Sequence, residues 1–398
     1  MKLQSRRDFL RIATSGAIAS RTIQASPTTL LIKAGRVIDP ASGLSAIRDI
    51  AIADKRISRI APSITEAGAQ RVLDARGKIV TPGLIDIHVH VYDALASTSI
   101  NADVSSVAKG ATTVVDAGSA GARIFPGFRK YVIERSKTRV FALLNISNVG
   151  FAAPNELSDL SFVDPASVVR TIEQNRDVIL GIKVRMTPNV VNKQDLEVLK
   201  RTREAADGAR VPIMVHIGGG AATLKEILSF LKSGDIVTHA LHARSGQIMD
   251  QSGKILSEVI EAQSRGVFMD IGHGSGNLSF EVAEKAASVG WFPDTISSDI
   301  HSGNVNGPVF DLATTLSKFL HVGMTLEQVV RCATATPAKI FRFPEKVGAL
   351  AEGSPADVGL FTLEEGQFEF TDSVRQKRTG RQKLTHFATV IGGEVLAK

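Results

Sequence analysis

Two histidines stand one residue apart in the apolar stretch GLIDIHVHVYD, residues 83–93. In a β-strand, residues i and i+2 point to the same face, so His88 and His90 should project together from one side of a strand that begins near Ile79. Two imidazoles on one face can bind a metal ion together. A hydrogen-bonded pair on the rim of a sheet would explain the same spacing, so the rest of the chain has to separate the two interpretations.

The middle of the chain alternates apolar, β-branched runs with helical patterns, which predicts βα units and a parallel sheet. The helical patterns are amphipathic and often contain a late glycine, as in 193–209, 221–234 and 279–290. Eight parallel strands, each followed by a helix, close into a (β/α)8 TIM barrel whose active site lies at the carboxyl ends of the strands. The expected strands are 79–90, 111–118, 139–148, 178–186, 211–218, 235–241, 267–274 and 295–301.

Five of these strands end in side chains that can bind metal. They are His88 and His90 on the first strand, Lys183 on the fourth, His216 on the fifth, His239 on the sixth and Asp299 on the eighth. Lys183 is unusual because an unpaired ammonium among apolar residues is costly to bury, although on its own it could reach the barrel rim. Since a barrel directs strand-end side chains toward one point, the six residues together predict a metal site.

The two ends of the chain have a different pattern. Residues 28–78 contain short alternating stretches separated by Gly, Pro and Asp turns, and the pattern returns after about Ala349. We therefore expect residues 26–78 plus 349–398 to form a small β-sandwich domain built from both chain ends. The barrel would occupy residues 79–348.

Residues 1–25 are expected to be an export signal of the twin-arginine type. Arg6 and Arg7 are followed by Phe-Leu, and small residues in Ala-x-Ala spacing end at Ala19, with Ala25 as an alternative cleavage point. This predicts a periplasmic or otherwise exported bacterial protein. The sequence contains no run of about 20 apolar residues, so we expect no membrane association after processing.

Charge and cysteine content exclude some classes of partner and fold. The formal net charge of +7 comes partly from the N-terminal stretch and partly from a basic cluster at 375–383. A solvated loop explains that cluster at least as well as a polyanion site, so we expect no nucleic-acid partner. Cys332, the single cysteine, forms no intramolecular disulfide and is expected to be a small core residue.

The chain resembles the amidohydrolase superfamily, in the subtype with two metal ions. The resemblance covers nearly everything after about Thr28 and includes TPGLIDIHVH at 81–90 and TPAKIF at 336–341. It implies that Lys183 is carboxylated to N6-carboxylysine and bridges the metals. It further implies that one metal is held by His88, His90 and Asp299, that the other is held by His216 and His239, and that a hydroxide bridges both. Zinc is the usual ion in that subtype, and neutral imidazole ligands agree with zinc.

The same resemblance implies a reaction and a substrate class. Asp299 would take a proton from the attacking hydroxide and pass it to the leaving group, as the catalytic base. The segments FMDIGHGSGNLSF, SSDIH and GPVFDL resemble the dihydroorotase-like deacetylase branch, whose members hydrolyse N-acyl-D-amino acids or acetyl-(R)-mandelate. This implies a small acylated acid as substrate. Its carboxylate would be bound by Asn148, Arg185 and His273, although a rim salt bridge would explain Arg185 and a loop hydrogen bond would explain His273.

Three other interpretations stay open. A cyclic amidase such as dihydroorotase is less favoured, because Tyr92 stands where the dihydroorotases that this chain resembles carry arginine. A non-catalytic barrel used in binding or assembly would typically lack several of the six ligands, all of which are present. A deaminase or isomerase on the same barrel is disfavoured by Lys183. The residues leave open the acyl group, the leaving atom and a possible homo-oligomer.

Overall fold

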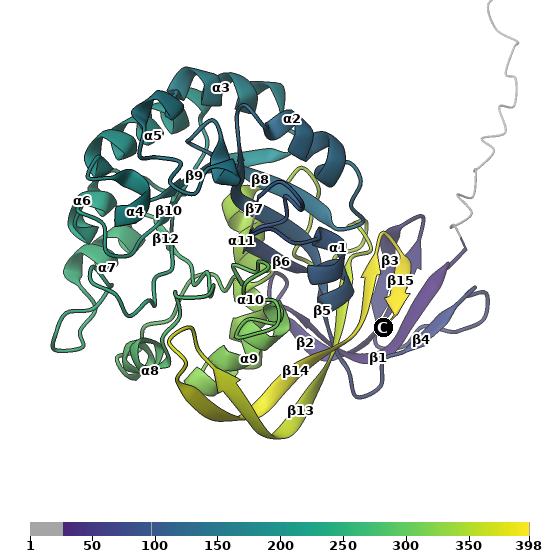
Figure 1. Cartoon of the computed structure of the whole chain (residues 1–398). Coiled ribbons are helices and arrows are strands. Elements are labelled where there is room, and N and C mark those ends of the chain that lie inside the picture. The colour runs from purple at the N-terminus through teal and green to yellow at the C-terminus, as the bar shows by residue number, and fades with distance from the viewer. Residues whose placement is uncertain (1–26, 97, 398) are drawn as a thin grey trace, which may run out of the picture.

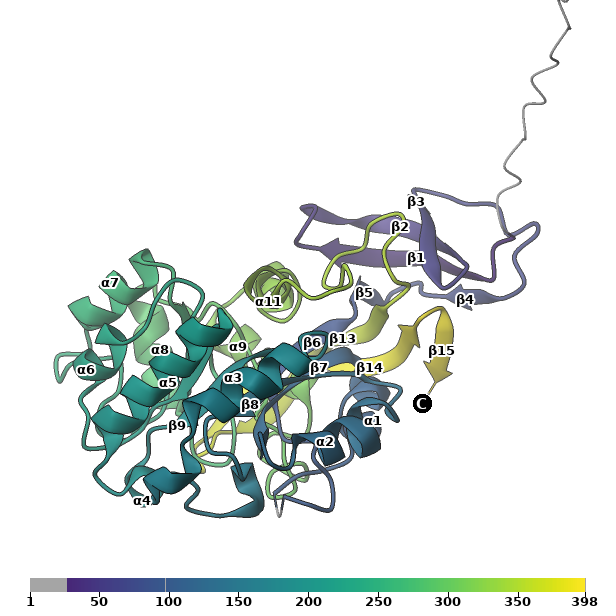
Figure 2. The same cartoon turned by 90° about the horizontal axis from the view of Figure 1, so that it is seen from above.

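The structure is a computed structural model and describes residues 27–96 and 98–397. The predicted export signal at residues 1–25 lies outside the described residues. The described chain contains two sheets: one is mixed and contains strands from both chain ends, and the other is parallel, curved and flanked by helices (Figure 1). Figure 2 shows the same arrangement from above, with β1 to β4 on one side and α5 to α8 on the other.

Both chain ends contribute to one mixed sheet, in the order β15-β14-β13-β5-β1-β2-β3, with β4 paired to β1. Local turns set part of this pairing, since Asp54 and Lys55 both have positive φ and connect β2 to β3 as a two-residue hairpin turn requires. The described residues form one sheet here, so the predicted β-sandwich stays a prediction. The strands are β1 Leu30–Asp39, β2 Leu44–Ala53, β3 Arg56–Ala61, β4 Val72–Asp74, β5 Ile79–Pro82, β13 Val358–Thr371, β14 Lys377–Ile391 and β15 Glu394–Ala397.

The second sheet is parallel and follows the chain order from β6 to β12. Each of the six strands expected between 111 and 274 coincides with one of its members, which confirms the prediction of an α/β fold with a parallel sheet. The strands are β6 Leu84–Val89, β7 Ala111–Gly121, β8 Arg139–Asn145, β9 Ile179–Arg185, β10 Ile213–His216, β11 Ile236–Thr238 and β12 Phe268–Met269.

The first expected strand, 79–90, is divided between the two sheets. Its first part, β5, pairs with β1 and β13, and the parallel sheet begins only at Leu84. Pro82 has no N–H to donate and ends β5. At Gly83 an added Cβ would lie 2.1 Å from Thr112 Oγ1, so this close approach of two strands requires glycine.

The eighth expected strand, 295–301, pairs with its neighbours less extensively than predicted. It forms single parallel bridges, from Thr295 to Asp270 beyond β12 and from Ile300 to Val89 of β6. These bridges connect the two edges of the parallel sheet through one segment. The segment therefore brings Asp299 to the strand ends that carry the histidines.

Helices surround the curved sheet, with α3 and α5 to α8 in an arc outside its strands (Figure 1). Local sequence fixes several of their ends: Thr223 and Glu226 form a capping box at the start of α6, and Gly323 ends α9 with a φ of 115°. The helices are α1 Ala102–Ser105, α2 Phe125–Phe128, α3 Pro165–Gln174, α4 Pro188–Val191, α5 Asp195–Ala209, α6 Leu224–Ser229, α7 Ser257–Ser264, α8 Phe280–Ser288, α9 Leu312–Val322, α10 Leu326–Cys332 and α11 Ala335–Phe341. The helical patterns expected at 193–209, 221–234 and 279–290 correspond to α5, α6 and α8.

Apolar clusters stabilise the two sheets, and a large one contains buried residues of both, such as Ile38 of β1 and Val114 of β7. One cluster lies within the parallel sheet and against α11, where Ile87, Val115, Leu143 and Phe341 are buried together. Cys332 is buried and unpaired, as expected for a core residue. Among the described helices, none combines the length and the apolar character needed to cross a membrane.

Candidate metal centre

The six predicted ligands lie together where the parallel strands end. His88 belongs to β6, Lys183 to β9 and His216 to the end of β10. His90 and His239 directly follow β6 and β11, and Asp299 lies in the bridging segment. All but His239 line one cavity of about 530 Å³, and the ring of His239 contacts that of His216 with centroids 4.0 Å apart.

His88, His90 and Asp299 form a compact cluster whose ligand atoms lie within 4.8 Å of one another. Oδ1 of Asp299 is 3.1 Å from Nε2 of His90 and 3.4 Å from Nε2 of His88. Burial alone would raise the pKa of Asp299, but the hydrogen bond from His90 and the charges of His90, His239 and His301 together lower it to about 2. An ionised carboxylate beside two imidazoles is a donor set suited to a divalent metal.

In two of the histidines, a hydrogen bond to an oxygen atom fixes the proton on Nδ1, so that Nε2 carries the lone pair. The carbonyl of Gly272 only accepts, so Nδ1 of His239, 2.6 Å away, donates to it and Nε2 keeps its lone pair. That Nε2 is buried and has no hydrogen-bond partner among the described residues. A metal ion is the natural partner for a buried imidazole lone pair of this kind.

His88 is fixed in the same tautomer by a longer chain of hydrogen bonds. Its Nδ1 lies 2.9 Å from Oγ1 of Thr238, whose hydroxyl donates to Asp270 at 2.7 Å. Because that hydroxyl proton is used, Nδ1 of His88 is the donor and Nε2 keeps its lone pair. In both His88 and His239, Nε2 therefore carries the lone pair that a metal ion requires.

Backbone strain is concentrated at the same place. His239 has a φ of 71° and Asp299 a φ of 47°, in the left-handed region that side chains rarely adopt. Such residues cost on the order of 1–3 kcal/mol each and persist where the surrounding structure holds them, often at ligand sites. Here the strained backbone directs the side chains of His239 and Asp299 toward the other predicted ligands.

Burial also keeps the imidazoles in the neutral form that binds metal. It lowers the pKa of His88 and of His216 well below the usual value of a histidine, and that of His239 to about 3. The nearby Lys183 contributes to the shifts at His88 and His216. At neutral pH these rings are therefore metal-binding bases.

Lys183 is fully buried at the centre of the group. Its Nζ is 3.0 Å from Nε2 of His88 and 3.9 Å from the sulfur of Met214. Burial lowers its pKa to about 7, although Asp299 partly opposes the shift. Gly118 makes room for the side chain, since a Cβ there would lie 2.7 Å from Cβ of Lys183.

Two buried carboxylates behind the ligands were missed in the sequence. Asp270 accepts hydrogen bonds from the hydroxyls of Thr238, Thr295 and Ser297, each at 2.7 Å. Asp86 accepts from the backbone and hydroxyl of Ser298, and burial raises its pKa to about 7. Their signal was an aspartate inside an otherwise apolar strand, in LIDIH and FMDIG.

The three residues expected to bind the substrate carboxylate lie in different surroundings. Arg185 lines the cavity with Lys183, but its Nε and Nη2 both donate to the buried carboxylate of Glu156. His273 is buried with Nε2 2.6 Å from Nζ of Lys318, and it does not line the cavity. Asn148 is also buried and absent from the lining. The structure thus brings only Arg185 of the three to the cavity.

Arg244 and Asn277 also lie on the cavity wall, and they were not singled out from the sequence. His301 lies on the same wall, where its Nε2 and the hydroxyl of Ser275 share a hydrogen bond of 3.1 Å. Arg244 follows the sixth expected strand, and loops after barrel strands form the active face, so its position was a usable signal.

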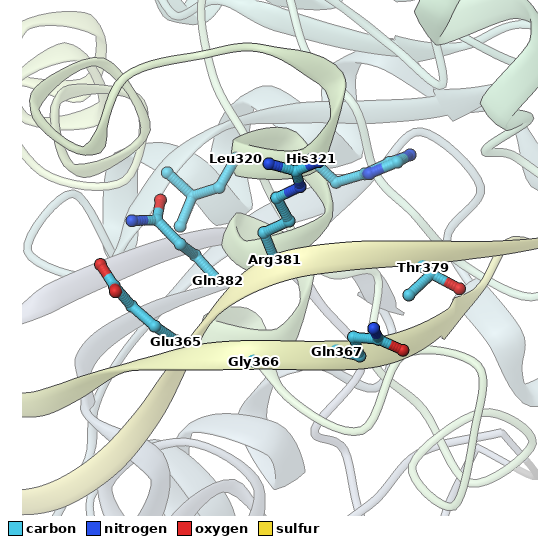
Figure 3. A pocket seen from close by; sticks show the side chains of 8 residues that line it. All are labelled: Leu320, His321, Glu365, Gly366, Gln367, Thr379, Arg381 and Gln382. Atoms are coloured by element: carbon cyan, nitrogen blue, oxygen red, sulfur yellow. The ribbon is translucent and has the colours of Figure 1, made fainter.

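A larger hollow of about 890 Å³ lies elsewhere, between α9 and the paired strands β13 and β14. Figure 3 shows its lining, with Arg381 extending from β14 toward Leu320 and His321 and with Glu365 on β13. It contains none of the six predicted ligands. The smaller cavity therefore remains the chemical candidate.

Comparison with known proteins shows similarity along most of the chain. The sequence profile of the amidohydrolase family matches residues 79–393. A deacetylase of Enterococcus faecalis is 36% identical over 369 residues, which cover 92% of this chain and 98% of that protein. A crystal structure described as an adenine deaminase has 35% identity and a TM-score of 0.87, covering 93% of this chain and 100% of that one. One described as a dihydroorotase has 34% identity and a TM-score of 0.85, covering 92% and 97%.

Proposed function

Because the chain belongs to the amidohydrolase family, we propose that it is a metal-dependent deacetylase that cleaves the amide or ester bond of a small acylated acid. The family match and the deacetylase relative support the coarser statement, a hydrolase that acts on carbon–nitrogen bonds. The observation that carries the proposal is the meeting of six potential ligands at the strand ends, with the lone pair of the buried His239 imidazole left free.

The proposed centre holds two divalent ions, which we propose to be zinc. His88, His90 and Asp299 would hold one ion, and His216 and His239 the other. When bound, such ions activate water near neutral pH and polarise a carbonyl. The surrounding hydrogen bonds, including that between Thr238 and His88, would hold the imidazoles in the orientation that binding requires.

Lys183 would complete the centre as N6-carboxylysine. Its Nζ is buried, and its hydrogen-bond partners are an imidazole nitrogen and a thioether. Within the part of the chain that the structure describes, no carboxylate lies at ion-pair distance to neutralise an ammonium there. In the modification, the neutral amine attacks the carbon of carbon dioxide, a nitrogen–carbon bond forms, and one proton leaves. The product is an anion placed between the two groups of ligands.

Asp299 would act as the catalytic base. Its Oδ1 faces the two histidines, and its Oδ2 accepts from the amide of Asn277 at 3.3 Å. This carboxylate can take a proton from the attacking water and return it to the leaving nitrogen or oxygen.

Two other activities deserve a direct comparison because of the structural neighbours described as an adenine deaminase and a dihydroorotase. A cyclic amidase and a deaminase would use the same kind of centre. Arg244 on the cavity wall favours an anionic substrate over neutral adenine. A non-catalytic binding barrel would need no catalytic base beside the ligands.

The test is a substrate panel with protein purified in the presence of zinc and bicarbonate. The panel contains N-acetyl-D-amino acids, their L-enantiomers, acetyl-(R)-mandelate, dihydroorotate and adenine. We expect turnover of the acetylated acids, with the D- or (R)-configuration preferred. Turnover of dihydroorotate or adenine alone would replace the proposed substrate class, and metal binding without any turnover would favour the binding barrel.

A further inference from the structure

Arg244 is an arginine on the cavity wall that has no acidic partner among the described residues. Within the described chain, no carboxylate lies within ion-pair distance of its guanidinium, whereas Arg185 on the same wall is paired with Glu156. Arg244 is also partly buried, and this burial lowers its pKa. A cation that is partly desolvated and unpaired is costly unless a ligand anion compensates it.

Two hydrogen bonds hold the guanidinium of Arg244 in position and leave some of its N–H donors unused. Nη1 donates to the carbonyl of Gly276 at 2.8 Å and Nη2 to Oδ1 of Asn277 at 2.7 Å. Nε is buried and has no hydrogen-bond partner among the described residues. A guanidinium carries five N–H donors, so each Nη still has a second N–H besides the one that it donates here.

Two glycines leave the space that the guanidinium of Arg244 occupies. At Gly218, which has a φ of 143°, an added Cβ would lie 2.5 Å from Nη2 and 2.7 Å from Nε of Arg244. At Gly276 a Cβ would approach Nη1 to 3.3 Å. The loops after β10 and β12 thus leave room for the guanidinium to lie against their backbone.

Asn277 connects Arg244 to Asp299, the proposed catalytic base. Asn277 accepts from Arg244 through Oδ1 and donates to Oδ2 of Asp299 through Nδ2, at 3.3 Å. The charge of Arg244 also reaches His216 and His239, whose pKa values it helps to lower. A ligand anion on Arg244 would therefore lie next to the proposed metal ligands and catalytic base.

We propose that Arg244, oriented by Asn277, binds the carboxylate of the acylated acid and so selects anionic substrates. The proposal rests on the function proposed above for its substrate class. It assigns the paired Arg185 to the support of the wall through Glu156, in place of direct carboxylate binding.

The test compares each acid with its neutral amide, so that charge is the main difference. Calorimetry on the metal-loaded protein measures binding of mandelate and mandelamide, lactate and lactamide, and N-acetylglycine and N-acetylglycinamide. Wild-type protein should bind at least one acid roughly 10- to 100-fold more tightly than its amide. Arg244→Met should remove that preference, Arg244→Lys should restore part of it, and the exposed control Arg123→Met should keep it.

Three results would overturn the assignment: no preference for any acid in the wild type, an unchanged preference in Arg244→Met, or loss of the preference in Arg185→Met alone. Kinetics separate this assignment from the proposed function. If the preference depends on Arg244 but no acylated acid is hydrolysed, the carboxylate site stands and the deacetylase proposal fails. If acylated acids are hydrolysed but Arg244→Met slows acids and amides equally, the deacetylase proposal stands and the carboxylate site fails.

Discussion

At the scale of single residues, the site depends on which nitrogen of each imidazole carries the proton. His88 and His239 donate from Nδ1 to fixed oxygen atoms, which leaves Nε2 for a metal. These tautomers follow from the hydrogen bonds of Thr238 and Gly272 and are not visible in the sequence motif. The H-x-H spacing alone predicted only that the rings share a face.

Replacing Thr238 by valine should weaken metal binding without removing a ligand. The change leaves Nδ1 of His88 without an acceptor and Asp270 without one of its donors. Loss of such a partner typically lowers metal affinity about 10- to 100-fold. Competition with a fluorescent zinc chelator measures the affinity, and Thr238→Ser, which keeps the hydroxyl, is the matched control. Equal affinities for the two variants would contradict the role given to Thr238.

Replacing Asp299 by asparagine should separate catalysis from metal binding. The amide keeps an oxygen at nearly the same place but accepts a proton poorly, so the turnover rate should fall roughly 100-fold or more. Most of the bound metal should remain, because the histidines and Lys183 are unchanged. Elemental analysis and initial rates on the same preparation measure both quantities. Full activity in this variant would exclude Asp299 as the base.

At the scale of elements, the sequence predicted the strands and the ends at which ligands occur. Local periodicity was sufficient for β7 to β12, since each strand is a short apolar run between turns. It was insufficient for β5 and for residues 295–301, whose pairing depends on distant partners such as β13 and Val89. For the same reason Arg244 and Asn277 were missed: their role comes from a contact between two loops 33 residues apart in sequence.

The loop after β12 shows how distant elements fix the site. In this loop the carbonyl of Gly272 accepts from His239, and the amide of Asn277 donates to Asp299. Lys318 of α9 contacts the loop at His273. Nζ of Lys318 contacts His273 Nε2 at 2.6 Å and donates to the carbonyls of Pro308 and Thr371 at 2.7 and 2.8 Å. Lys318, which is only 1% exposed, therefore connects three segments of the chain.

Lys318→Met should therefore destabilise the protein markedly. The substitution removes the donor to the buried Nε2 of His273 and to two partly buried carbonyls, at an expected cost of about 2–4 kcal/mol in the free energy of unfolding. Lys109→Met is the control, because Nζ of Lys109 lies 3.9 Å from Asp311 on a side chain that is 43% exposed. Denaturant unfolding of the two variants measures the difference. If both unfold with the same midpoint, Lys318 has no such connecting role.

At the scale of the whole molecule, the mixed sheet and the parallel sheet share specific contacts. Arg139 at the start of β8 forms an ion pair with Asp357, the residue before β13, and a second pair with Glu345 at 2.7 Å. The carbonyl of Asp357 also accepts from the backbone of Gly83, where the chain passes between the sheets. Expecting strands from both ends to meet was possible from composition, but the residues that attach them to the barrel strands were not identifiable from local pattern.

Arg139→Met should weaken this attachment. It would leave Asp357, whose side chain is 6% exposed, without its cationic partner, at an expected cost of about 2–3 kcal/mol. Arg76→Met removes a pair whose side chains are 78% and 50% exposed and should leave the unfolding midpoint unchanged. Thermal unfolding followed by circular dichroism measures both, and a stable Arg139→Met variant would contradict the proposed attachment.

The central claim is that hydrolysis depends on two metal ions held by the six strand-end residues. The most direct measurement removes all metal from the wild-type protein with a chelator and then adds zinc stepwise in bicarbonate buffer. Bound metal and the rate of deacetylation are followed in the same samples. We predict no activity in the metal-free protein and a parallel rise of both quantities up to about two ions per chain. Activity that persists without metal, or metal binding that stays below one ion per chain, would contradict the claim.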